Sequence, residues 1–123
     1  MKEKIFAFIT IILIIVAVAS NTIKMHKDID EIYSAVENID IEQPTNESRQ
    51  EAHDAYDLFK KKEHFIGLTV NHDDLSNIED CFAEMIGNLK TDDPDGATVA
   101  KNRLLNALSH LRRLSSFNID AII

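Results

Sequence analysis

Cysteine is almost missing from this 123-residue sequence, because Cys81 is the only one. No disulfide can therefore form within the chain, and a lipid-modified N-terminus is excluded because no cysteine follows the first apolar run. The sequence also has no Ser-x-x-Lys, Gly-x-Ser-x-Gly, P-loop or His-Glu-x-x-His pattern, the motifs of common hydrolases, nucleotide-binding proteins and zinc proteases. No segment after the apolar run has the pattern of a strand. These absences favour a helical protein that is not an enzyme.

Positive charge is scarce as well, and the net charge is −8. Lys2, Glu3 and Lys4 precede the apolar run, so residues 24–123 hold 11 of the 13 basic and 20 of the 21 acidic residues, a net charge of −9. This excess repels phosphate backbones, so we expect no nucleic-acid partner. An anionic membrane surface would be repelled too, apart from Lys24 and Lys27 next to the apolar run.

A long apolar run is what the sequence has in place of these features. Residues 5–23 are 19 uncharged residues, close to the roughly 20 that span a bilayer as a helix. We predict a membrane anchor over residues 1–23, which meets the lipid bilayer through residues 5–23, and a soluble domain over residues 24–123. The alternative is a secreted protein produced by cleavage following Ala19, since Ala17-Val18-Ala19 has the small-x-small form of a signal-peptide site.

The anchor is the favoured interpretation because the helical pattern continues past Ser20 without glycine or proline. Lys2, Lys4 and the amino group precede the run, which favours a single-pass protein of the cell membrane with its N-terminus inside. The soluble domain would then be extracytoplasmic.

Apolar residues at helical spacing predict four helices in all, over about residues 4–39, 46–68, 75–89 and 94–115. The stripes expected to face inward are Ile29, Ile32, Val36 and Ile39; Ala52, Ala55, Tyr56, Phe59, Phe65 and Ile66; Leu75, Ile78, Phe82, Met85 and Leu89; and Ala100, Leu104, Ala107, Leu111 and Leu114. Tyr33 and Ile86 are expected beside the first and third stripes, and Leu105 and Leu108 widen the last one. The fold class is therefore all-α, an N-terminal transmembrane helix continuing into a small antiparallel bundle of three to four helices.

Polar residues mark the expected helix ends. Pro44 ends the first helix, and Thr45 or Asn46 caps the second. Asp74 is the expected cap of the third helix, although the chain around it could also continue as one kinked helix. Asp93 is the expected cap of the fourth, with Pro94 as its first residue. The apolar tail, residues 117–123, is expected to pack back on the bundle.

The main candidate for a binding site is His72 with Asp73 and Asp74, joined by His53 if the fold brings it near. Histidine and carboxylates could hold a divalent cation between the second and third helices. One histidine is too few for a structural zinc site, so a turn with an Asp cap is the favoured interpretation, and no metal or cofactor is predicted. The pairs His53/Asp57 and Lys60/His64 are expected on a solvated helix face.

Three further features have ordinary structural interpretations. Cys81 is expected to be a packing residue, since Asp80 and Glu84 would raise its pKa. The stretch 92–96 is similar to a calcium loop, but it places Asn102 where the bidentate glutamate should be, so it is predicted to be a turn. Lys62 stands at an apolar position of its helix, with its stem expected to lie along apolar surface.

The whole chain resembles an uncharacterised bacterial family of short membrane-anchored helical proteins, domain of unknown function 4363. The similarity lies in the apolar run 5–19, in the stretch 72–79, and in Leu104, Leu108, His110 and Leu111 before an Ile-rich terminus. The resemblance implies a hydrophobic N-terminal segment followed by mostly helical residues, and it implies no activity, substrate or cofactor.

These observations together predict a non-enzymatic interaction or structural module at the cell envelope. Its partner would be an unknown protein or a second copy of the chain. A sensor that binds a metal or small ligand through His72, Asp73, Asp74 and His53 is the alternative hypothesis.

Overall fold

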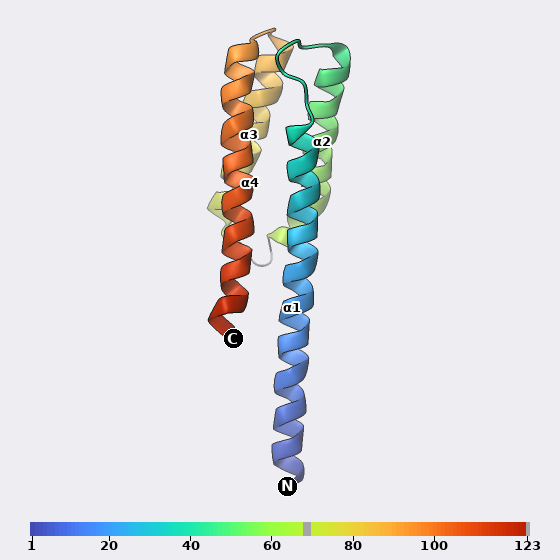
Figure 1. Ribbon diagram of the computed structural model, residues 1–123, viewed down its shortest axis with the longest axis vertical. Helices are drawn as coiled ribbons and strands as arrows, with labels where there is room; N and C mark the ends of the chain where they lie inside the picture. Colours follow the sequence, from blue (N-terminus) through green and yellow to red (C-terminus); the bar gives the residue numbers. More distant parts are fainter. Residues whose placement is uncertain (68–69, 123) are drawn as a thin grey trace.

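A computed structural model describes residues 1–67 and 70–122, with side chains placed up to Leu114. Within those residues the chain forms four helices and no strand: α1 (Lys2–Glu37), α2 (Asn46–Ile66), α3 (His72–Lys90) and α4 (Pro94–Ile122). The helices run alternately in opposite directions (Figure 1), with α1 and α3 each packed against α2 and α4. The expected all-α antiparallel bundle is confirmed, and α2 and α3 are two helices rather than one kinked helix.

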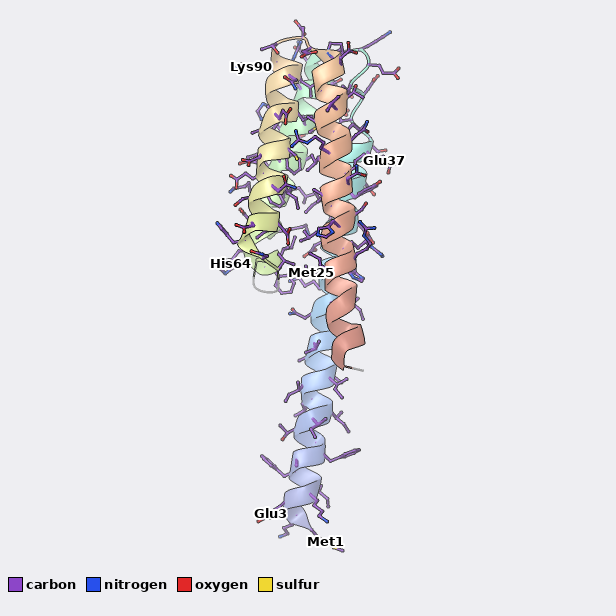
Figure 2. The ribbon with its side chains drawn as sticks, turned by 90° about the vertical axis from the view of Figure 1, so that its left-hand side faces the viewer. Met1, Glu3, Met25, Glu37, His64 and Lys90 are labelled. Carbon is purple, nitrogen blue, oxygen red and sulfur yellow. The ribbon has the colours of Figure 1, made fainter. Side chains whose placement is uncertain are left out.

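Helix α1 has two halves with opposite surroundings. Its large apolar side chains between Ile5 and Val16 are 41–74% exposed, and Figure 2 shows this half standing clear of the bundle. From Met25 onward its apolar stripe is buried, with Ile29, Ile32 and Val36 no more than 1% exposed. At 36 residues and 1.5 Å per residue, the helix is about 54 Å long. Among the described residues, α1 alone is long and apolar enough to cross a membrane.

No break separates the two halves of α1. The uncharged run ends at Ile23, and the first buried side chain is Thr22. Thr22 Oγ1 donates a hydrogen bond to the carbonyl of Val18 at 3.0 Å, and Thr10 Oγ1 donates to that of Phe6 at 2.8 Å. Hydroxyls bonded to the preceding turn need no water, so they do not interrupt the apolar surface.

The core contains most of the predicted stripes, with a change of phase in α4. Leu108 is fully buried, whereas Ala107 is only partly buried and Leu114 is 37% exposed. Leu114 was therefore predicted wrongly and Ala107 lies at the edge of the core, because the inward face of α4 follows steps of 3, 4, 4 and 3 residues centred on the widened side of the predicted stripe. Tyr56 and Phe65 lie at the edge of the core rather than in it. The buried apolar side chains of α4 are Ala97, Ala100, Leu104, Leu108 and Leu111.

Two of the predicted helix caps are confirmed and one is wrong. Thr45 Oγ1 accepts from the backbone N–H of Ser48 at 3.1 Å, and Asp93 Oδ1 accepts from that of Gly96 at 3.0 Å. Helix α3 begins earlier than expected, and Asn71 rather than Asp74 caps it, accepting from Asp73 N–H at 3.1 Å. The side-chain oxygen of an asparagine caps a helix as well as a carboxylate does. The spacing of the sequence alone therefore did not distinguish Asn71 from Asp74.

Helix α4 also continues to Ile122, past the predicted end at Ser115. Packing of the tail 117–123 back onto the bundle concerns side chains outside the described residues. The backbone of α4 runs back toward the exposed half of α1 (Figure 1), so both ends of the chain lie on the same side of the bundle.

Acidic residues concentrate at the opposite end of the bundle, where the α1–α2 and α3–α4 connections lie. We call this end the acidic tip, and it carries Glu37, Asp40, Glu42, Glu47, Asp92, Asp93 and Asp95. Seven of the basic residues lie toward the exposed half of α1 instead: Lys24, Lys27, Lys60, Lys61, Lys62, Arg112 and Arg113.

A lysine from α4 completes the end of α1. Lys101 Nζ donates to the carbonyls of Glu37 and Ile39 at 2.9 and 2.8 Å. The last carbonyls of a helix have no partner within it and carry partial negative charge. Lys101 therefore satisfies them and fixes α4 against α1.

Replacing Lys101 with Met should lower the free energy of unfolding by about 1–2 kcal/mol, because two hydrogen bonds to a charged donor are lost, one of them from the partly buried carbonyl of Ile39. Denaturant titration in detergent micelles, followed by far-ultraviolet circular dichroism, measures this change. Lys90→Met is the control at an exposed position and should change stability by less than about 0.5 kcal/mol. Equal effects of the two substitutions would show that Lys101 has no special role.

Candidate functional site

The four candidate metal ligands do not meet. His72 is the first residue of α3, with Asp73 and Asp74 in the first turn, and all three stand at the end of the bundle near the exposed half of α1. His53 lies 13 residues before the end of α2, a distance of about 20 Å along the helix. Among the described residues, no group of three or more His, Cys, Asp or Glu side chains could hold a metal ion.

The stretch 92–96, which is similar to a calcium loop in sequence, forms a turn and the start of α4. Asp92 has a φ of 56°, a left-handed conformation that aspartate tolerates, and its carboxylate pairs with Arg49 at 2.5 Å. Asp93 caps α4. A β-carbon on Gly96 would collide with the carboxyl group of Asp93, so Gly96 leaves room for that cap. The two carboxylates thus have structural roles.

Cys81 is a packing residue. It is 2% exposed on the inward face of α3. Burial raises the pKa of its thiol, Arg103 opposes that shift, and Glu84 and Asp80 add to it. A protonated, buried thiol is a poor nucleophile.

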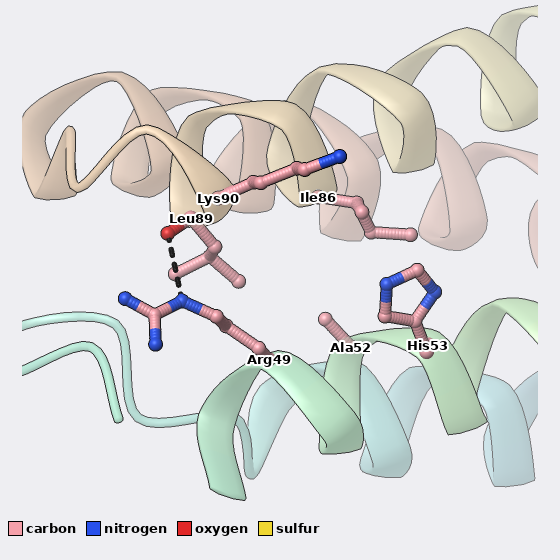
Figure 3. Close-up of a pocket in the computed structure, with 6 residues that line it drawn as sticks. All are labelled: Arg49, Ala52, His53, Ile86, Leu89 and Lys90. Carbon is pink, nitrogen blue, oxygen red and sulfur yellow. Dashed lines mark hydrogen bonds between the residues drawn. The ribbon is translucent and has the colours of Figure 1, made fainter. Parts of the chain in front are cut away.

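A cavity of about 280 Å³ lies between the start of α2 and the end of α3 (Figure 3). Its lining is basic and apolar and consists of Arg49, Ala52, His53, Ile86, Leu89 and Lys90. Arg49 is already engaged, since Nε donates to the Leu89 carbonyl at 3.2 Å and the other nitrogens bond Asn46 and Asp92. Its guanidinium therefore closes the end of α3, which leaves little of it for a ligand.

Polar contacts also join α2 and α3 near their middles. Tyr56 Oη donates to Glu79 at 3.2 Å, and its ring meets Phe82 edge-on. Burial first, and the Glu79 carboxylate second, raise the pKa of Tyr56. Lys60, like His53, Asp57 and His64, is exposed as expected of a solvated helix face, and it pairs with Glu63 at 2.9 Å and Glu79 at 3.4 Å. These contacts hold α2 against α3 and engage the hydroxyl of Tyr56, the ammonium of Lys60 and the carboxylate of Glu79.

The most distinctive polar group in the core is Asp28 on α1. Its side chain is 8% exposed, and its carboxylate lies 2.8 Å from Lys62 Nζ. The same Nζ also pairs with Glu31, at 3.1 Å. The hydrogen bond to Asp28 is the main cause of a raised pKa for Lys62, with burial opposing it. The stabilisation that comes from the lysine charge is fully present below the ordinary lysine pKa of 10.5 and is lost as pH rises through the raised value.

The occurrence of Lys62 at an apolar position of its helix was the sequence feature that marked this ion pair. From the sequence alone, this position was explained only by packing of the lysine methylene groups along apolar surface. Asp28 sits beside Ile29 in the inward stripe of α1, and an acid there needs a partner. Pairing the two residues required the register of α1 against α2. Arg49 and Lys101 were missed for the same reason.

Comparisons with protein-family models, curated proteins and solved structures find no match to this chain. The resemblance to a bacterial membrane-anchored family therefore stays a prediction.

Cys81 should not react with a thiol reagent such as dithionitrobenzoate while the protein is folded, because its thiol is buried and its pKa is raised. Reaction should become complete within the mixing time in denaturant. Absorbance of the released thiolate follows both rates, and fast labelling of the folded protein would contradict the buried assignment.

Replacing Lys62 with Met should cost about 2–3 kcal/mol of unfolding free energy, less than for a wholly buried pair because the lysine is partly exposed. The loss follows because Asp28 keeps its charge without a counter-ion. The double variant Asp28→Leu with Lys62→Met should recover most of the stability, since apolar residues can replace an ion pair. Denaturant titration measures both, and a double variant as unstable as the single one would contradict this explanation.

Proposed function

We propose that this protein is a single-pass membrane protein of the cell envelope whose helical bundle is a non-enzymatic interaction or structural module. The observation that carries the proposal is the continuity of α1, which serves as apolar rod in one half and as core helix in the other. A rigid connection of this kind would hold the bundle at a fixed height and orientation above the bilayer.

Lipid is the natural surrounding for the exposed half of α1. Large apolar side chains cover all its faces from Ile5 to Val16, and in water a surface of this size would favour aggregation. Each Leu, Ile, Val or Phe at the centre of a span contributes about −0.3 to −0.6 kcal/mol to insertion. The internally bonded Thr10 adds little cost. These terms together favour insertion by several kcal/mol.

For orientation we propose the N-terminus inside and the bundle outside, as Lys2, Lys4 and the amino group favour. Cleavage following Ala19 would give a secreted form that keeps the whole core, since the first buried side chain is Thr22. A mature protein that begins at Ser20 would establish that alternative.

Two features support binding over catalysis. Cys81 is buried with a raised thiol pKa, and His72 stands apart from His53. A second cavity, of about 420 Å³, lies between α1 and α2 beside the small residues Ala35 and Ala55. Small residues leave room there for a side chain of another protein or of a second copy. No observation favours a metal sensor at His72.

Membrane insertion should fail when charge enters the apolar half of α1. Leu13→Arg with Ile14→Arg adds about 5–7 kcal/mol to the insertion free energy, which cancels the apolar gain. Flotation with vesicles and extraction with alkaline carbonate measure the membrane-bound fraction. Leu13→Ile with Ile14→Leu is the matched control and should remain bound. Full membrane binding of the arginine variant would contradict the anchor.

Rigidity should matter for contact with the partner. Two seven-residue inserts between Ser20 and Asn21, one rich in Gly and Ser and one rich in Ala, Glu and Lys, compare a flexible with a helical connection. Seven residues make almost two helical turns, so the helical insert nearly keeps the facing of the bundle.

Only the flexible insert should reduce the yield of the crosslinked partner in intact membranes, while circular dichroism shows both proteins folded. Equal crosslinking of the native protein and both variants would argue against a role for the rigid connection between the membrane anchor and the bundle.

A further inference from the structure

A third cavity lies where α1 leaves the apolar run. It has a volume of about 300 Å³ and is lined by residues of α1 and α2: Lys24, Asp28, Glu31, Leu58, Lys61, Lys62 and Phe65. We call it the lysine cavity. Lys24 directly follows Ile23, the last residue of the run, and its Nζ lies 4.2 Å from the centre of the Phe65 ring. In the proposed membrane arrangement, this part of the cavity is level with the lipid headgroups.

The charges of the lysine cavity do not balance. Its two acids, Asp28 and Glu31, both pair with Lys62. Lys24 lies over the face of the Phe65 ring, which attracts a cation but carries no net charge to neutralise it. Lys61 is exposed. Within the described residues, no acid pairs with either Lys24 or Lys61, so two ammonium groups flank one concave, partly apolar surface of an acidic protein.

We propose that the lysine cavity binds the phosphate of an anionic phospholipid headgroup, a site that rests on the proposed membrane anchor. The phosphate would lie between Lys24 and Lys61, and the acyl chains would follow the apolar half of α1. Two ammonium groups on different helices can engage one phosphate as point charges. Ligand pockets usually measure roughly 300–1,000 Å³, so this volume suits a headgroup rather than a whole lipid.

The position of the site explains why a bilayer lipid is the expected occupant. The lipid reaches Lys24 from the same layer that holds residues 5–23, at an effective concentration far above that of a dissolved anion. Asp28 and Glu31 share the single charge of Lys62, so the three lysines and two acids of the cavity leave it a net charge of +1. Anionic headgroups are also attracted to juxtamembrane cations in general, so the experiment must separate a site from diffuse attraction.

The test uses the full chain in nanodiscs made of equal amounts of phosphatidylcholine and phosphatidylglycerol. Native mass spectrometry measures which lipid stays bound after release. The native protein should retain the anionic lipid in several-fold excess. Lys24→Gln with Lys61→Gln should bring that ratio close to one, and Lys24→Arg with Lys61→Arg should preserve it, which shows that charge at these positions, and not folding, sets the ratio.

Lys27→Gln with Lys90→Gln is the matched control, because both lysines are exposed outside the cavity and the change of charge is equal. This variant should keep the native ratio. An equal loss in both glutamine variants, or no loss in the first, would overturn the headgroup site. Failure of the native chain to enter nanodiscs would overturn the anchor and, with it, the site, whereas entry without lipid preference would overturn the site alone.

Discussion

The structure depends on one uninterrupted helix that needs two different surroundings. Between Ile5 and Val16, α1 has no polar group that requires water, and its other half is buried against α2 and α4. Since Thr22 and Met25 already belong to the core, the change takes place within about two helical turns. The bundle therefore begins where the apolar surface ends, and no segment of chain is available as a hinge.

Cationic side chains set the register of the bundle. Lys101 closes the end of α1 from α4, Arg49 closes the end of α3 from α2, and Lys62 neutralises Asp28 across α1 and α2. Each of these contacts joins residues at least 34 positions apart. Apolar stripes allow neighbouring helices to slide by a turn, whereas a charge placed on a buried acid or a helix end permits one alignment.

This division explains how much the sequence predicted. Helix order, the α2 and α4 caps and most of the core depend on local spacing, which is visible in the chain. The cap of α3 was misassigned because Asn71, Asp73 and Asp74 can all accept a backbone N–H. The centre of the inward face of α4 lies at Leu108 rather than Ala107, because Leu105 and Leu108 widened the predicted stripe and spacing alone did not show which side of it is buried. The ion pairs and the lysine cavity need the tertiary register, so no local pattern could have revealed them.

Because the charges are unevenly distributed along the bundle, the net charge does not describe what a surface at one end of it meets. The acidic tip at Glu37 lies 13 residues beyond Lys24 along α1, about 20 Å at 1.5 Å per residue. The Debye length in physiological salt is about 8 Å, so the tip is screened from a surface at the level of Lys24. An anionic bilayer in the proposed arrangement would face an end where seven basic residues stand among acids such as Asp28, Asp30, Glu31, Asp73 and Asp74, and not the average of the molecule. A protein with a formal charge of −8 can thus approach a negative surface with less repulsion than its net charge suggests, because the acids of the tip are directed away from that surface.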